Sequence, residues 1–296
     1  MNANKPVLSE QTIKQLLKFQ LNELTEHEIY LRIAQHVKAP ADRDVLLRIA
    51  REEETHGKLW QSYTGKKVRL PRLKIWWYSL LSRVLGYTFA LKIMEKGEDN
   101  ASSAYETVAK EVPEARQIGE EEKRHEEALI AMLDEERLQY VGSMVLGLND
   151  ALVELTGTLA GLSFALQNTR LIALSGLITG ISATLSMASS EYLSARSEGE
   201  PNALKSSIYT GVMYLVAVVL LVLPYLVFPA QSFVAALITM LVIVVAIIFG
   251  FTYYISVAKD LPFKKRFTEM ACISLSVAAL SFVVGILVKE FLGIDI

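Results

Sequence analysis

Two short motifs combine a glutamate and a histidine three residues apart, and they hold the residues best suited to chemistry. They are Glu53–His56 in REEETH and Glu122–His125 in EEKRHEE. On a helix this spacing puts a carboxylate and an imidazole on one face, one turn apart. Carboxylates suit hard ions such as iron and manganese, while imidazole disfavours calcium and magnesium. Together the motifs predict a site for a transition metal.

Further acids complete the pattern of such a site. A di-iron carboxylate bundle takes one glutamate from each of two helices and Glu-x-x-His from each of the other two. Glu23 is available before the first motif, and Glu95 and Glu98 lie between the two motifs. The alternative interpretation is an acidic, solvated surface. We assign that role to the remaining acids near the motifs, which are Glu26, Glu28, Glu52, Glu54, Glu120, Glu121, Glu126 and Glu127.

A second set of acids lies in apolar sequence. Asp150 and Glu154 are four residues apart in GSMVLGLNDALVELTGTLAGLS, and Met187 and Glu191 are four apart in GISATLSMASSEYLS. Each pair shares one helical face. A carboxylate inside a bilayer is costly, so its presence in a membrane span indicates a functional site. Lipid-facing or core packing is the alternative for Met187, and a position at the membrane surface is the alternative for Glu191.

Helices must position the first set of residues. Apolar spacing predicts helices over 9–38, capped by Ser9 and ended by Pro40, and over 41–64, ended by Gly65. A third helix extends to about Lys110, and a fourth runs from Pro113 to about Tyr140. The basic, Trp-rich residues 66–78 precede the third helix. They fit either an anchor at the membrane surface or a solvated linker.

The composition divides the chain into two parts. Residues 1–140 hold 22 of the 30 basic and 23 of the 32 acidic residues, and the other 156 residues hold 8 and 9. Beyond Gly142 five apolar runs are each long enough to cross a bilayer, over 143–165, 171–194, 206–228, 231–256 and 268–292. Residues 206–258 carry no charge, and Pro224 and Pro229 mark the reversal between two spans. The predicted domains are therefore 1–140 and 141–296.

Charges in the loops predict the orientation of the spans. Arg196 and Lys205 follow the second run, and Lys259, Lys264, Lys265 and Arg266 follow the fourth. The positive-inside rule then places the N-terminal domain in the cytoplasm and the C-terminus outside. No signal peptide precedes the first helix. The net charge of −2 gives no indication of nucleic acid as a partner, and the single cysteine, Cys272, excludes an intrachain disulfide and any CxxC site.

Residues 9–138 resemble the rubrerythrin-type ferritin-like domain in NELTEHEIY, REEETH, EKGE and EEKRHEE. The resemblance implies a site for two iron ions, or manganese, with ligands at Glu23, Glu53, His56, Glu95, Glu98, Glu122 and His125. It also implies a hydrogen bond from Tyr30 to a ligand carboxylate, the alternative being core packing. Rubrerythrins often add a rubredoxin module with two CxxC pairs. A single cysteine excludes that module, so redox turnover needs an external electron donor.

Residues 142–292 resemble the vacuolar iron transporter family in GLNDALVELTGTLAGLS and SMASSEYLS. The resemblance implies a five-span fold, a homodimer, and a metal path lined by Asp150, Met187 and Glu191. Glu154 is added to the path by its spacing. The family usually carries a long acidic, Met-rich helical insert after the second span, where this chain has only Ser197–Lys205. We expect the N-terminal domain to take its place, as in the membrane-bound ferritin branch.

The sequence therefore predicts an all-α protein, with a ferritin-like four-helix bundle followed by a five-helix transmembrane bundle. The expected function is export of Fe²⁺, or Mn²⁺, from the cytoplasm in exchange for protons. The bundle would capture, oxidise or sense the metal. The alternatives are a membrane-anchored di-iron ferroxidase or peroxidase, and a metal sensor without transport.

Overall fold

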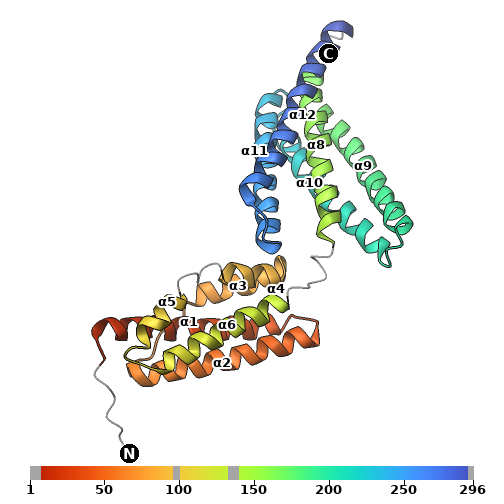
Figure 1. The fold of residues 1–296 in the computed structure, drawn as a ribbon. Coiled ribbons are helices and arrows are strands. Elements are labelled where there is room, and N and C mark those ends of the chain that lie inside the picture. Colours follow the sequence, from red (N-terminus) through yellow and green to blue (C-terminus); the bar gives the residue numbers. More distant parts are fainter. Residues whose placement is uncertain (1–7, 96–100, 133–139, 293–296) are drawn as a thin grey trace, which may run out of the picture. The chain divides into compact units, whose positions relative to one another are not determined.

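A computed structural model describes residues 8–95, 101–132 and 140–292 of the chain. Every regular element within these ranges is an α-helix, which confirms the all-α prediction. The chain forms two compact units, Met1–Glu135 and Glu136–Ile296. Figure 1 shows the helices of each unit.

The first unit contains six described helices, whose ends follow local sequence signals. They are α1 (Glu10–Ala34), α2 (Pro40–Thr64), α3 (Arg72–Val84), α4 (Tyr87–Glu95), α5 (Ala101–Val108) and α6 (Glu114–Ala131). As predicted, Ser9 caps α1, accepting a hydrogen bond from the Thr12 amide at 3.2 Å. Gly65 ends α2 in the left-handed conformation, with φ 64°.

The single third helix predicted up to Lys110 is wrong, because α3, α4 and α5 occupy that stretch. Between α3 and α4, Gly86 adopts φ 98°, a left-handed conformation that glycine tolerates and a continuous helix does not. The end predicted for the fourth helix, near Tyr140, lies beyond α6, next to residues 133–139 outside the described ranges.

Two apolar clusters hold the helices of the first unit together. α1 packs along α2 and also contacts α3 and α5, and α6 contacts α2 and α5. One cluster joins α1, α2, α3, α4 and the end of α6 through residues such as Ile29, Leu46 and Leu91. The other is centred on the fully buried Trp60, with Phe19 and Tyr105 beside it. These clusters fix the helix faces that carry the predicted ligands.

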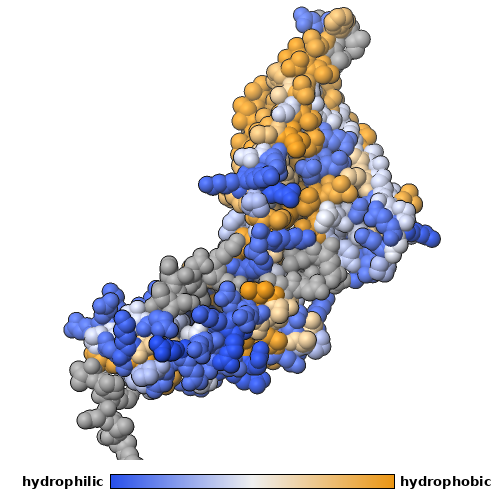
Figure 2. Space-filling model, viewed as in Figure 1, coloured by the Kyte–Doolittle hydropathy of each residue, from blue (hydrophilic) through white to orange (hydrophobic). Residues whose placement is uncertain are grey.

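The described part of the second unit contains five helices long and apolar enough to cross a membrane, as predicted. They are α8 (Val141–Leu166), α9 (Thr169–Ser197), α10 (Ala203–Val227), α11 (Phe233–Ala258) and α12 (Phe263–Leu292). Pro229 lies in the turn between α10 and α11, but Pro224, which we expected there, lies buried inside α10, one turn before its end. Figure 2 shows apolar residues over much of this unit, whereas the visible surface of the first unit is mostly hydrophilic.

Glycines allow close packing within the second unit. A Cβ atom on Gly147 would lie 2.3 Å from the carbonyl oxygen of Thr210, so the backbones of α8 and α10 approach closely at this point. A Cβ on Gly285 would similarly lie 2.7 Å from the carbonyl oxygen of Gly161, where α12 meets α8. The predicted Gly157–Gly161 motif therefore faces α12.

Candidate metal centre and membrane acids

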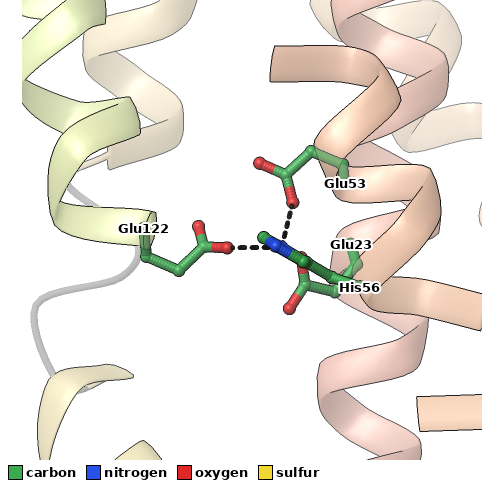
Figure 3. A group of neighbouring side chains, drawn as sticks. All are labelled: Glu23, Glu53, His56 and Glu122. Carbon is green, nitrogen blue, oxygen red and sulfur yellow. Dashed lines mark hydrogen bonds and ion pairs between the residues drawn. The ribbon is translucent and has the colours of Figure 1, made fainter. Parts of the chain in front are cut away.

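Side chains from three helices of the first unit converge on one point (Figure 3). Glu23 comes from α1, Glu53 and His56 from α2, and Glu122 from α6. One potential ligand atom from each of the four lies within 4.8 Å of the others. The Nδ1 atom of His56 lies 3.1 Å from Glu122 Oε1 and 3.4 Å from Glu23 Oε2. Among the described His, Cys, Asp and Glu residues, this is the one group of three or more placed closely enough to share an ion.

His125 extends the same cluster. Its Nδ1 atom lies 3.0 Å from Glu53 Oε1 and 3.8 Å from Glu122 Oε2. The His56 and His125 rings are stacked, with centroids 5.8 Å apart. Glu53 and Glu122 thus each approach both imidazoles. This brings together five of the seven predicted ligands: Glu23, Glu53, His56, Glu122 and His125.

The structure does not describe the side chains of the other two predicted ligands. Glu98 lies outside the described residues, and of Glu95 the structure describes only its place at the end of α4. Their role as ligands remains a prediction.

Two acids that we assigned to the solvated surface contact the histidines instead. Glu121 Oε2 lies 2.8 Å from His56 Nε2, and Glu52 Oε2 lies 2.6 Å from His125 Nε2. Each of these acids reaches the histidine of the other helix, since Glu121 is on α6 and Glu52 on α2. A third acid from that group, Glu26, is buried rather than solvated.

Two aromatic residues that the sequence did not single out hold Glu23. Its Oε1 atom accepts hydrogen bonds from Trp60 Nε1 at 3.1 Å and from the Tyr105 hydroxyl at 2.9 Å. Trp60 follows His56 by four residues on α2, so its position on the same helical face was a usable signal. Tyr30, for which we predicted a bond to a ligand carboxylate, is buried in the apolar cluster of α1 to α4. Its hydrogen bond to a ligand remains a prediction.

The cluster satisfies a physical test for a cation site. Glu23 Oε2 and Glu53 Oε2 are buried, yet neither has a hydrogen-bond partner among the described residues. Buried polar atoms are otherwise nearly always paired. Carboxylate oxygens and imidazole nitrogens also form a ligand set that iron and manganese accept. The residues therefore fit a bound transition metal.

Closely spaced carboxyl groups around two imidazoles shift the pKa values of the residues in the cluster. Burial, together with the neighbouring Glu23 carboxylate, raises the pKa of Glu53 well above its usual value. Burial also opposes a charge on His125, but the neighbouring Glu122 and Glu53 carboxylates outweigh it and raise its pKa to about 10. Burial likewise opposes a charge on His56, but the neighbouring Glu122 and Glu23 carboxylates outweigh it and raise the pKa of His56. The metal-free cluster therefore holds protons where a cation would bind.

A pocket of about 190 Å³ opens beside His125. It is lined by Arg48, Glu52, Glu121, Arg124 and His125. Both acids that contact the histidine Nε2 atoms thus belong to its wall. The pocket gives solvent access to one side of the cluster.

In the second unit, the acids predicted to line a path contact polar groups of neighbouring helices. Glu154 Oε2 on α8 accepts a hydrogen bond from the Tyr214 hydroxyl of α10 at 3.0 Å. Glu191 Oε1 on α9 accepts one from Ser143 Oγ of α8 at 2.7 Å. The Ser143 carbonyl in turn accepts from Thr210 Oγ1 of α10 at 3.0 Å. The start of α8 is thereby joined to both α9 and α10.

Asp150 and Met187 lie on the same two helices as these acids. Asp150 is half-buried on α8, one turn before Glu154, and Met187 packs against the apolar core one turn before Glu191. Within the described part of the chain, Asp150, Glu154 and Glu191 do not form a group close enough to share one ion. The structure thus places the predicted path residues on adjacent helices without assembling them into one site.

Comparison with known proteins bears on this second unit. Residues 141–202 match the VIT family. The matched segment contains all four predicted path residues, and it covers α8, α9 and the loop to α10. The match agrees with the resemblance found in the residues of that segment, and the segment includes the first two of the five apolar helices. No curated protein and no solved structure matches the chain.

Proposed function

We propose that this protein transports Fe²⁺, and also Mn²⁺, across a membrane. The observation that carries the proposal is the placement of Asp150 and Glu154 on α8, an apolar helix inside the segment that matches the VIT family. Ionisable residues within a membrane helix are costly, and they mark ion pathways. Met187 and Glu191 on the neighbouring α9 supply further ligand atoms.

These side chains suit the passage of a divalent cation. Carboxylates and a thioether can replace part of the water shell of such an ion, and the carboxylates can also accept protons. Tyr214 holds one oxygen of Glu154, which leaves its other oxygen for the ion. We propose that protons move against the metal, and that the basic loops keep the first unit in the cytoplasm, so that the metal leaves the cell.

We propose that the first unit is a ferritin-like domain that captures the metal for transport. Glu23, Glu53, His56, Glu122 and His125 would hold resident iron or manganese, with Glu95 and Glu98 as further ligands. When bound, two such ions supply redox chemistry with oxygen or peroxide. Supporting this role, one buried carboxylate oxygen of Glu23 and one of Glu53 have no hydrogen-bond partner among the described residues.

We also propose a homodimer. Glu154 is an exposed residue on α8 when one chain is considered alone. An exposed carboxylate on a spanning helix would face hydrocarbon, which is unfavourable. A second copy covering this side of α8 would remove that cost. Light scattering in mild detergent should therefore give the mass of two chains, and the mass of one chain would contradict the dimer.

Transport can be tested with purified protein in proteoliposomes under an imposed pH gradient. Wild type should accumulate Fe²⁺, whereas Asp150→Asn, which keeps the shape and removes the charge, should lose at least about tenfold in rate, because even a residue that only supports a metal ligand usually costs that much when it is changed. Glu269→Gln is the matched control, because Glu269 is an exposed acid of the same unit outside the matched segment. Equal rates for wild type and Asp150→Asn would contradict the proposal.

The buried cluster favours one alternative, a membrane-anchored ferroxidase or peroxidase. In that case the second unit only attaches the enzyme to the membrane. Turnover of Fe²⁺ or of peroxide, with a supplied electron donor, would then be equal in wild type and Asp150→Asn, and neither protein would transport metal.

A further inference from the structure

Helix α3 is packed on only one side. Its residues Ile75 and Ser79 are buried, and Ile75 joins the apolar cluster formed with α1, α2 and α4. The opposite side of α3 carries large apolar side chains. Leu73 is 77% exposed, Trp76 53%, Trp77 51% and Val84 61%. These four side chains are called the α3 face here, and each of them is more than half exposed.

The α3 face is apolar along its centre and basic along its edges. With about 100° between successive helical residues, Leu73, Trp76, Trp77 and Val84 fall within one third of the helix circumference. Arg72 and Arg83 flank that stripe on one side, and Lys74 flanks it on the other. All three cations are exposed, and none forms an ion pair among the described residues.

The charge around α3 contrasts with the rest of its unit. Residues 65–94 hold seven basic and no acidic residues. The remainder of residues 1–140 holds 15 basic and 23 acidic residues. A cationic segment with exposed tryptophans thus lies within an otherwise acidic unit, so its charge is a local feature of α3 and its surroundings.

We propose that the α3 face binds the surface of a bilayer that contains anionic phospholipids. Tryptophan favours the level of the lipid headgroups, where its ring is buried and its N–H stays hydrated. Basic residues beside a membrane are attracted to anionic lipid. An amphipathic helix with an apolar stripe between cations has the features of a segment that lies in this interface.

Two further observations select the bilayer over other occupants. The same chain continues into five helices able to cross a membrane, so a lipid surface is held at high effective concentration. A second copy of the chain is disfavoured, because pairing two α3 faces would bring their arginines and lysines together. The bound helix would hold the first unit against the membrane. This proposal depends on the membrane domain but not on transport.

The tryptophans make the proposal directly measurable. All three tryptophans of the chain, Trp60, Trp76 and Trp77, lie in the first unit, and Trp60 is fully buried. The full-length protein should be placed in nanodiscs of lipid with brominated acyl chains, with and without about 30% phosphatidylglycerol, an anionic lipid. On anionic discs the emission should fall at least about twofold relative to unbrominated discs, as expected for a helix seated in the interface. Trp76→Phe with Trp77→Phe leaves only Trp60, and its emission should not respond.

Charge variants test the role of the headgroups. Arg72→Gln, Lys74→Gln and Arg83→Gln together should abolish the quenching on anionic discs. Lys14→Gln, Lys18→Gln and Lys38→Gln together remove the same charge from exposed positions on and just after α1, and they should leave the quenching unchanged.

Three outcomes would overturn the proposal. Unquenched emission means that the α3 face does not contact lipid, and unquenched emission shifted to the blue would indicate a protein partner such as a second copy. Equal quenching on neutral and anionic discs, unchanged by the α3 charge variants, would remove the anionic headgroup as the ligand.

Discussion

The two histidines of the cluster use their two ring nitrogens differently. In both rings Nδ1 points toward the inner carboxylates, and Nε2 contacts an outer one, Glu121 for His56 and Glu52 for His125. A carboxylate on the second nitrogen fixes the orientation and tautomer of the ring and increases its basicity as a ligand. Glu52 and Glu121 are therefore positioning residues, although both are partly exposed.

Glu121→Gln should weaken metal binding by about 10- to 100-fold, the usual effect of losing such a partner. Binding of Fe²⁺ or Co²⁺ to the full-length protein, followed by absorbance or calorimetry, measures it. Glu120→Gln is the matched control, since Glu120 is the exposed neighbour on α6. Equal affinity in both variants would assign Glu121 to the solvated surface after all.

Metal binding should release protons at pH 7.5. The neighbouring Glu122 and Glu53 carboxylates raise the pKa of His125 from its ordinary 6.5 to about 10, so the metal-free ring is protonated at this pH. A ligand imidazole must be neutral, so metal displaces that proton and the affinity rises with pH. Calorimetry in two buffers of different ionisation enthalpy counts the protons. Identical heats in both buffers would show that the ring was already neutral.

At this scale the sequence predicted five residues that the structure brings together, but it did not predict the residues that contact them. Glu52 and Glu53 are adjacent in REEETH, and only the crossing of α2 and α6 decides that Glu52 reaches His125. Tyr105, which donates to Glu23, lies 82 residues from it, and no local spacing connects the two. Contacts set by the packing of distant helices leave no periodic signal in one sequence.

At the level of elements, the glycines of α8 set the spacing between helices of the membrane unit. Gly147→Ala should destabilise the protein on the order of 1–3 kcal/mol, as overpacking does. The reason is that the new Cβ would meet the Thr210 carbonyl oxygen of α10 at 2.3 Å. Thermal unfolding in detergent measures the loss. Gly250→Ala is the control, because nothing lies within 4 Å of its added Cβ, and an equal loss in both variants would disprove this explanation.

The spans were predictable within a few residues because long apolar runs have clear ends. The predicted 143–165 became Val141–Leu166, and 231–256 became Phe233–Ala258. The first unit was harder, since its third predicted helix bends away at Gly86. That glycine is visible in the sequence, but a glycine inside a helical pattern is often tolerated. Its left-handed conformation accompanies the packing of α4 against the cluster around Ile29, and the sequence does not show that packing.

At the scale of the whole molecule, the division into two units agrees with the uneven distribution of charge. We proposed that the first unit captures metal and the second transports it, and the full chain allows a test of these roles. His56→Gln with His125→Gln should leave maximal Fe²⁺ transport unchanged and reduce transport at low metal concentration, because only capture is impaired. Transport rates over a range of Fe²⁺ concentrations measure this. An unchanged concentration dependence would separate the cluster from transport.

The crossed contacts between α2 and α6 have a further consequence for how metal would load. Glu52 and His56 belong to α2, yet their partners His125 and Glu121 belong to α6, so each helix supplies half of both histidine environments. Any movement of α6 away from α2 therefore disrupts both histidines together. For the two ions of the proposed site we therefore expect cooperative binding, because an ion that fixes the crossing of α2 and α6 also orients the ligands of the other ion.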